Sequence, residues 1–146
     1  EEHRRQSQSP VLARANEFFR QISLGGFSEL TTDFVDDQQI LIGIRDTGAK
    51  VKIEEMSDGT RDQLYLSLRL AYLDHELTES DREPMPFVLD DILMNFDDAR
   101  SAATLKILVE LSKKTQIIYF THHQHLLKLA QKDGDDEQVK IHHLAG

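Results

Sequence analysis

Three segments decide the fold: Met85–Asp91 (MPFVLDD), Met94–Asp98 (MNFDD) and Ile117–His123 (IIYFTHH). The apolar run in the first segment predicts a strand that ends in two carboxylates, Asp90 and Asp91. The apolar run in the third segment predicts a strand that ends in His122 and His123. Side chains that follow the carboxyl ends of parallel strands form the usual site of an open α/β sheet. These segments therefore predict such a site.

The segments between and after these two strands have the apolar periodicity of helices. Asp97 or Asp98 caps a predicted helix whose expected inward positions are Ala102, Leu105, Leu108, Val109 and Leu111. Leu126, Leu127 and Ala130 mark a further helix, Asp133–Asp136 a turn, and Val139–Leu144 alternates as a final strand. From Pro86 onward the predicted order is β-α-β-α-β, which favours a parallel sheet with right-handed crossovers.

The first half of the chain has a different character. Pro10 opens a helix with one apolar face, which should stop near Gly25. Residues 27–53 then read as a meander of three short strands, at 30–35, 39–45 and 49–54. A long apolar helix follows Ser57, and Asp74–Pro84 reads as an exposed polar connector.

Length and composition limit the class of protein. The chain has 146 residues, 39% hydrophobic and 29% charged, which is typical of one globular domain. We divide it into a frayed end of an upstream coiled-coil segment (1–9), a helix with a β-subdomain (10–55) and an α/β lobe (56–146). There is no cysteine, and no apolar run suits a signal peptide or a membrane span, so we expect a cytoplasmic protein. The net charge of −9 argues against a broad nucleic-acid platform on this surface.

Two groups of residues carry possible chemistry. Ser57 and Gly59 begin a helix, where free backbone N–H groups suit a phosphate, although most such sequences only cap the helix. Asp90 and Asp91 could hold Mg²⁺ and orient a water molecule, whereas a solvated acidic pair is the structural alternative. We expect Asp90 to be held at depth by a partner or a metal. His142 and His143 read as surface residues of the final strand.

With these motifs in order, the chain resembles the C-terminal lobe of an ABC-type ATPase head. The group it resembles is the SMC-like family that includes RecN, RecF, the double-strand-break repair ATPases and the YhaN-like proteins. Residues 56–60 (MSDGT) are similar to the family's signature, commonly LSGGQ, and residues 87–91 (FVLDD) to its Walker B strand. Residues 95–97 (NFD) stand where the D-loop stands, and residues 120–123 (FTHH) resemble the switch-histidine strand end. The motifs cover about residues 56–125.

The resemblance implies a role for each matching residue. Asp90 would support Mg²⁺, Asp91 would polarise the attacking water, and His123, or His122 if the register shifts by one, would contact the γ-phosphate of ATP. Asp97 would act across a head–head interface.

The signature residues would act in trans. Ser57 and Gly59, with Thr60 and Arg61 beside them, would close on ATP held by a second head of a homodimer. The resemblance also implies DNA as a ligand of the parent protein, in DNA repair or chromosome maintenance, and no membrane.

The sequence departs from the family pattern at three points. The usual glutamate after the Walker B aspartate is Asp91, which is one methylene shorter, and the first glycine of the signature pair is Asp58, which should point away from a phosphate. No G-x-x-x-x-G-K-[ST] loop occurs in the chain. In this family that Walker A loop lies in an N-terminal lobe, so the chain is expected to be half of a head and inactive when isolated.

Two other classes of function compete with this interpretation. A metal-dependent phosphoesterase could use Asp90, Asp91, His122 and His123, but it leaves the signature helix unexplained. A non-catalytic docking module would pack on an N-terminal lobe without hydrolysing ATP. Stoichiometric metal in the purified protein would favour the first, and failure of an added lobe to give ATPase activity would favour the second.

Overall fold

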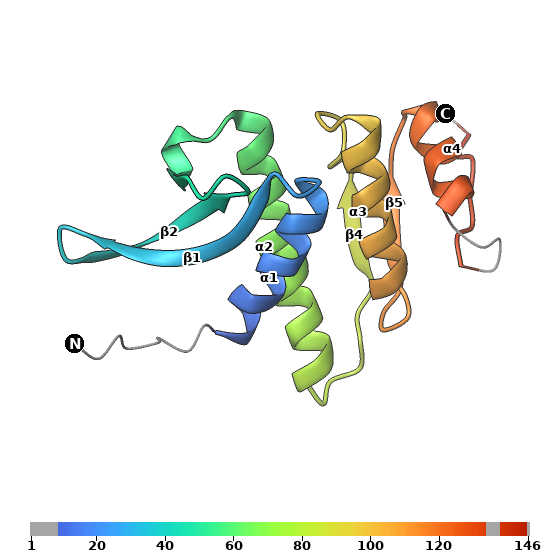
Figure 1. Ribbon diagram of the computed structural model, residues 1–146. Helices are drawn as coiled ribbons and strands as arrows, with labels where there is room; N and C mark the ends of the chain where they lie inside the picture. The colour runs from blue at the N-terminus through green and yellow to red at the C-terminus, as the bar shows by residue number, and fades with distance from the viewer. Residues whose placement is uncertain (1–8, 134–137, 146) are drawn as a thin grey trace. The chain divides into compact units, whose positions relative to one another are not determined.

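The computed structural model describes residues 9–133 and 138–145. Its elements in chain order are α1 (Pro10–Ile22), β1 (Phe27–Val35), β2 (Gln38–Arg45), β3 (Lys50–Lys52), a 3₁₀ turn (Ile53–Glu55), α2 (Asp58–Glu79), β4 (Phe87–Asp90), α3 (Asp98–Leu111), β5 (Ile117–Phe120) and α4 (Gln124–Asp133) (Figure 1). They form two compact units, Glu1–Glu76 and Leu77–Gly146. The predicted α/β class, with an N-terminal helix, a β-meander and a parallel sheet, is confirmed.

The helix α1 begins and ends as the sequence predicts. Ser9 caps it, because its Oγ accepts a hydrogen bond from the N–H of Leu12, and Pro10 occupies the first turn. The chain then turns through Leu24 and Gly25, which both have positive φ. The inward face of α1 buries Ala15, Phe18, Phe19 and Ile22.

The meander of the first unit is an antiparallel sheet in the order β1-β2-β3. Asp36 and Asp37 form the β1–β2 turn with positive φ, as a two-residue hairpin requires. The Phe27 ring lies 4.8 Å from that of Phe19, which ties the sheet to α1. A Cβ at Gly43 would lie 2.8 Å from the Phe27 ring, so this position needs glycine. The third strand is shorter than predicted, because a 3₁₀ turn begins at Ile53.

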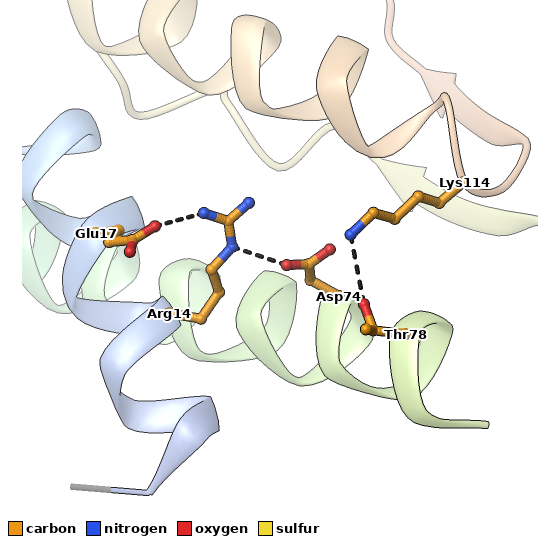
Figure 2. Close-up of polar contacts among 5 residues, drawn as sticks. All are labelled: Arg14, Glu17, Asp74, Thr78 and Lys114. Carbon is orange, nitrogen blue, oxygen red and sulfur yellow. Dashed lines mark hydrogen bonds and ion pairs between the residues drawn. The ribbon is translucent and has the colours of Figure 1, made fainter.

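The helix α2 continues past the point where a polar connector was predicted. The prediction of an exposed connector from Asp74 is wrong at its start, since α2 extends to Glu79 and Asp74 is buried. Arg14 of α1 explains the burial: its Nε lies 2.7 Å from Asp74 Oδ2, and its guanidinium also pairs with Glu17 (Figure 2). Burial works to lower the pKa of Arg14, but the hydrogen bonds to both carboxylates outweigh it and raise that pKa.

The second unit is built on a parallel pair of strands, β4 and β5, with Leu89 opposite Tyr119. Alternation along β4 buries Leu89 and exposes Val88. α3 and α4 pack together in this unit, and its buried apolar residues are Leu89, Leu93, Phe96, Ile107, Leu108, Leu111 and Leu126. Side chains also tie the segments that precede the two strands. Thr115 Oγ1 donates to the Met85 carbonyl at 2.7 Å, and Lys114 Nζ donates at 3.4 Å to Thr78 Oγ1 near the end of α2 (Figure 2).

The predicted final strand at Val139–Leu144 is wrong, because residues 139–145 have no regular secondary structure. Alternating apolar residues form a strand only where a neighbouring strand accepts their hydrogen bonds, and the sheet of this unit pairs β4 with β5 alone in the described ranges. The turn predicted at Asp133–Asp136 falls largely on residues outside the described ones, while His142 and His143 are exposed as predicted. Of the helices in the described part of the chain, none is long and apolar enough to cross a membrane.

Candidate functional site

The candidate site of the second unit lies where β4 and β5 end side by side. Asp90 is opposite Phe120 in the parallel register, and the N–H of Asp91 donates to the Phe120 carbonyl at 2.8 Å. Asp91 itself has a left-handed backbone conformation, with φ of 49°. Aspartate tolerates that conformation better than most residues, and it ends the strand abruptly. Asp91 is therefore fixed at the edge where the next strand delivers Thr121, His122 and His123.

The carboxylate of Asp91 is the centre of this site. Its Oδ1 accepts a hydrogen bond from Thr121 Oγ1 at 3.0 Å, and its Oδ2 lies 3.1 Å from His122 Nδ1 and 3.5 Å from His123 Nε2. Only 15% of the Asp91 side chain is exposed. Thr121 donates to one oxygen of this largely buried carboxylate, and the other oxygen faces the two histidine rings. The geometry leaves it oriented toward the end of β5.

The two histidines differ in their surroundings although they are adjacent in the chain. The side chain of His122 is 79% exposed, whereas that of His123 is 31% exposed. Their ring centroids are 4.2 Å apart, and the backbone N–H of His123 donates to Thr121 Oγ1 at 3.1 Å. His123 Nε2 is enclosed and has no hydrogen-bond partner among the described residues. The 3.5 Å between this atom and Asp91 Oδ2 is therefore a close approach without a hydrogen bond.

Asp90 does not lie at the depth that its sequence context suggested. The expectation of a deeply held charge is wrong, because Asp90 is exposed while its neighbour Leu89 is buried. Alternation along β4 places these two side chains on opposite faces, and the apolar run before Asp90 concealed that alternation. An exposed carboxylate at a strand end still suits Mg²⁺, which prefers oxygen ligands and keeps several waters.

The acidic loop after β4 starts α3. Asp97 is the N-cap, and its Oδ1 accepts a hydrogen bond from the Arg100 N–H at 2.8 Å. That backbone bond is the main cause that lowers the pKa of Asp97, slight burial opposes it, and the Arg100 side chain adds to the lowering. The loop is also tied to β5, because the N–H of Leu93 donates to Tyr119 Oη at 3.1 Å. Burial raises the pKa of Tyr119, and the charges of Asp91 and Asp90 raise it further against the opposing effect of the Leu93 bond.

The predicted signature residues lie at the start of α2. Ser57 Oγ accepts a hydrogen bond from the Thr60 N–H at 3.2 Å and lies 2.8 Å from Thr60 Oγ1. Asp58 points into solvent, with 93% of its side chain exposed, and forms an ion pair with Arg61. A Cβ at Gly59 would meet nothing within 4 Å. The fold of this chain therefore places no steric demand for glycine at position 59.

Sequence reasoning missed two residues of the site, Thr121 and Tyr119. Both lie on or directly after β5, and each bonds to the segment that follows β4 across about 30 residues of sequence. The signal available in the sequence was their position beside the histidines, at the end of a strand next to the acidic one.

The phosphoesterase alternative required four residues to share one site. Among the residues that the structure describes, the group whose donor atoms lie within 4.8 Å of one another consists of Asp91, His122 and His123, without Asp90. Both histidines approach Asp91 and not Asp90, because Asp91 has left the regular strand conformation while Asp90 remains in β4.

Sequence comparison gives one informative relative. No family model matches the chain. The uncharacterized protein YhaN of Bacillus subtilis (strain 168) is 35% identical over 127 residues, which is 86% of this chain. The chain spans 13% of the length of that protein.

Comparison of folds gives SMC head domains. A structure reported for ATP-driven dimerization and DNA-stimulated activation of SMC ATPases matches with a TM-score of 0.66 and 19% identity, over 84% of this chain and 73% of the other. The SMC head domain from Thermotoga maritima matches with a TM-score of 0.58 and 20% identity, over 86% and 42%. The Smc head domain of Pyrococcus furiosus bound to the C-terminal domain of ScpA matches with a TM-score of 0.62 and 19% identity. The match covers 83% of this chain and 30% of the other.

Proposed function

Because the chain has the fold of the C-terminal lobe of an SMC-like ATPase head, we propose that it supplies one half of a composite ATP hydrolase. The other half is an N-terminal lobe with the Walker A loop, which binds the phosphates of ATP. In this proposal, hydrolysis requires two such heads to dimerise, and the parent protein uses it in DNA repair or chromosome maintenance. The observation that carries the proposal is the carboxylate of Asp91, oriented by Thr121 and facing two histidines at the strand ends.

Asp91 is the group we propose to polarise the attacking water. An aspartate reaches less far than the glutamate usual in the family. Its left-handed backbone compensates by turning the residue out of β4, and Thr121 fixes one carboxylate oxygen. The second oxygen remains directed toward the histidines, where His123 or His122 would contact the γ-phosphate. Because the carboxylate is already held in place, little free energy is spent on reorienting it when it activates a water molecule.

The residues present also fit the proposed metal. Asp90 offers exposed oxygens at the end of β4, next to Asp91. When bound, Mg²⁺ supplies positive charge that offsets the charge on the phosphate oxygens. Asp90 would hold the ion largely through water, as is usual for Mg²⁺ in phosphoryl-transfer sites.

The start of α2 supports a role in a second interface. A Cβ at Gly59 would meet nothing within 4 Å among the described residues, and Ser57 presents a hydroxyl beside the first N–H groups of the helix. Both features suit the approach of a phosphate held by another head. Thr60 and Arg61 are engaged locally, with Ser57 and Asp58, so Arg61 would have to exchange partners to act on ATP.

The test is the Mg-ATPase activity of this chain co-expressed with the N-terminal lobe of its parent. Activity should require both lobes, and Asp91→Asn should abolish it while the complex remains folded. Asp98→Asn is the control for the same chemical change at an exposed acid, whose Oδ1 lies 4.0 Å from His125 Nε2. A well-folded two-lobe complex without ATPase activity, with and without DNA, would instead indicate a docking module.

A further inference from the structure

We propose that Asp91, His122 and His123 also form a binding site for a divalent transition metal, with Zn²⁺ as the ion that fits best. The proposal concerns binding by the chain itself and is separate from the Mg²⁺ assigned to Asp90. It assumes no hydrolytic chemistry at the zinc.

The spacing of the donor atoms supports the site. Two ligands that each lie about 2.0–2.1 Å from a tetrahedral zinc are about 3.3–3.4 Å apart. Asp91 Oδ2 lies 3.1 Å from His122 Nδ1 and 3.5 Å from His123 Nε2, and all three donor atoms fall within 4.8 Å of one another. The two distances from Asp91 Oδ2 lie on either side of the value expected for zinc ligands, and the His122 side chain is 79% exposed.

The hydrogen bonding around the donors supports it as well. His123 Nε2 is enclosed without a hydrogen-bond partner among the described residues, which is costly for a polar atom unless a ligand satisfies it. Asp91 Oδ1 is already bonded to Thr121, so Oδ2 is the oxygen left for a metal. Thr121 would then be the outer-shell partner that orients a metal-bound carboxylate.

The chemistry of the donors decides which ion fits. Two imidazole nitrogens and one carboxylate oxygen suit zinc and its neighbours among the first-row metals, whereas Mg²⁺ prefers oxygen ligands. With three protein ligands, a tetrahedral zinc has a fourth coordination position. This position would be open to water on the side of the exposed His122 ring. Because zinc would occupy the oxygen proposed to polarise water, zinc binding and ATP hydrolysis should exclude each other.

The first experiment measures Zn²⁺ binding to the purified chain by competition with a chromogenic chelator, with Mg²⁺ in excess. We expect one zinc per chain that Mg²⁺ does not displace. His122→Gln, at an exposed position that leaves folding intact, should weaken binding by more than the 10–100-fold typical for loss of an outer-shell partner. Asp91→Asn should do the same.

Two controls separate this site from general histidine binding. His125→Gln changes a neighbouring histidine whose closest acidic contact is Asp98 at 4.0 Å, and His142→Gln/His143→Gln removes two exposed histidines. Both should bind zinc like the wild type. Three results would each overturn the proposal. They are an equal loss of zinc binding in these controls, unchanged zinc binding in His122→Gln and Asp91→Asn, and the absence of stoichiometric zinc in the wild type.

A second measurement tests the predicted exclusion in the two-lobe complex, and this step alone rests on the proposed ATPase function. Zinc should inhibit Mg-ATPase activity reversibly, with recovery on chelation, and His125→Gln should not alter the inhibition. Hydrolysis that continues at full rate with zinc bound would refute the exclusion. Absence of ATPase activity without zinc would contradict the proposed function and leave the metal site to be judged by binding.

Discussion

At the scale of single residues, Thr121 decides how Asp91 is presented. Its hydroxyl accepts the His123 N–H and donates to Asp91 Oδ1, so the accepted bond leaves the hydroxyl proton directed at the carboxylate. A side chain that orients another in this way is a positioning residue. Its loss should change the rate of the chemical step more than the binding of substrate.

Thr121→Val tests this role. A hydrogen bond to a charged group contributes about 1.5–3 kcal/mol, which corresponds to about a tenfold to hundredfold fall in kcat, with little change in KM. Thr121→Ser should restore most of the rate. Thr115→Val is the control, because it removes a hydroxyl bonded to a backbone carbonyl in the same unit and should affect stability only. Equal ATPase rates in Thr121→Val and the wild-type complex would refute the positioning role.

Gly59 gives a second prediction at this scale. Since a Cβ there meets nothing and Gly59 lies in the first turn of α2, Gly59→Ala should raise the free energy of unfolding by less than the ~1 kcal/mol typical of a helix interior. If the residue serves a head–head interface, the same change should lower the ATPase activity of the dimerised head. Gly43→Ala is the contrasting control, which should destabilise the fold because its Cβ would lie 2.8 Å from Phe27. Unfolding is followed by circular dichroism, and an active, stabilised Gly59→Ala head would argue against the interface role.

At the scale of elements, the start of α3 depends on one side chain. Asp97 caps the helix through the Arg100 N–H and also stands at the position that resembles the D-loop. Structural and interface roles can be separated, because asparagine also caps helices whereas alanine does not.

We expect Asp97→Ala to lower the free energy of unfolding by about 0.5–2 kcal/mol, and Asp97→Asn to lower it much less. The folded-state pKa of Asp97 is lowered, so the charged cap stabilises the fold above the unfolded-state pKa of about 3.9 and this effect is lost as pH falls through the folded-state value. The difference between wild type and Asp97→Asn should therefore shrink below about pH 4. Urea unfolding at several pH values measures it, and a difference that grows in acid would contradict the assignment.

The pairing of α1 with α2 depends on Arg14 and Asp74. The exposed fractions of their side chains are 38% and 10%, so the pair is intermediate between surface and buried ion pairs. A double-mutant cycle with Arg14→Met and Asp74→Asn should give a coupling energy of about 1–3 kcal/mol. The matched control is a second double-mutant cycle that combines Arg14→Met with Glu17→Gln. Its coupling energy should stay below about 1 kcal/mol, because the Glu17 side chain is 50% exposed. Equal couplings would show that burial of Asp74 adds nothing.

At the scale of the whole molecule, the β4–β5 sheet leaves apolar side chains uncovered. Val88 is 52% exposed and lies two residues before the end of β4, and Phe120 is 45% exposed and is the last residue of β5. Sheets with parallel strands are normally covered on both faces. We expect the Walker A lobe to cover this face in a complete head.

The isolated chain should therefore self-associate at high concentration, and Val88→Thr/Phe120→Thr should reduce that association in sedimentation velocity. Met85→Thr is the control, since Met85 is 81% exposed but precedes β4. Co-expression with the N-terminal lobe should give a one-to-one complex that no longer self-associates. Association that persists unchanged in the double variant would place the contact elsewhere.

Much of the fold followed from local signals. The apolar face after Pro10, the runs at Phe87 and Ile117 and the cap at Asp97 each lie within one element, so the sequence predicted α1, β4, β5 and the start of α3. The fold class, and the resemblance to an SMC-like head, followed from motifs whose order and spacing are properties of the chain.

The structure alone decided the contacts between distant residues. Whether Asp90 or Asp91 faces the histidines depends on where β4 stops alternating and on a left-handed backbone at Asp91. Burial of Asp74 depends on Arg14, 60 residues away, and the apolar alternation at Val139–Leu144 found no neighbouring strand in the described sheet. Local patterns fix which elements form, because caps and periodicity act within a few residues. Side-chain partners come from packing, which joins segments that the sequence keeps apart.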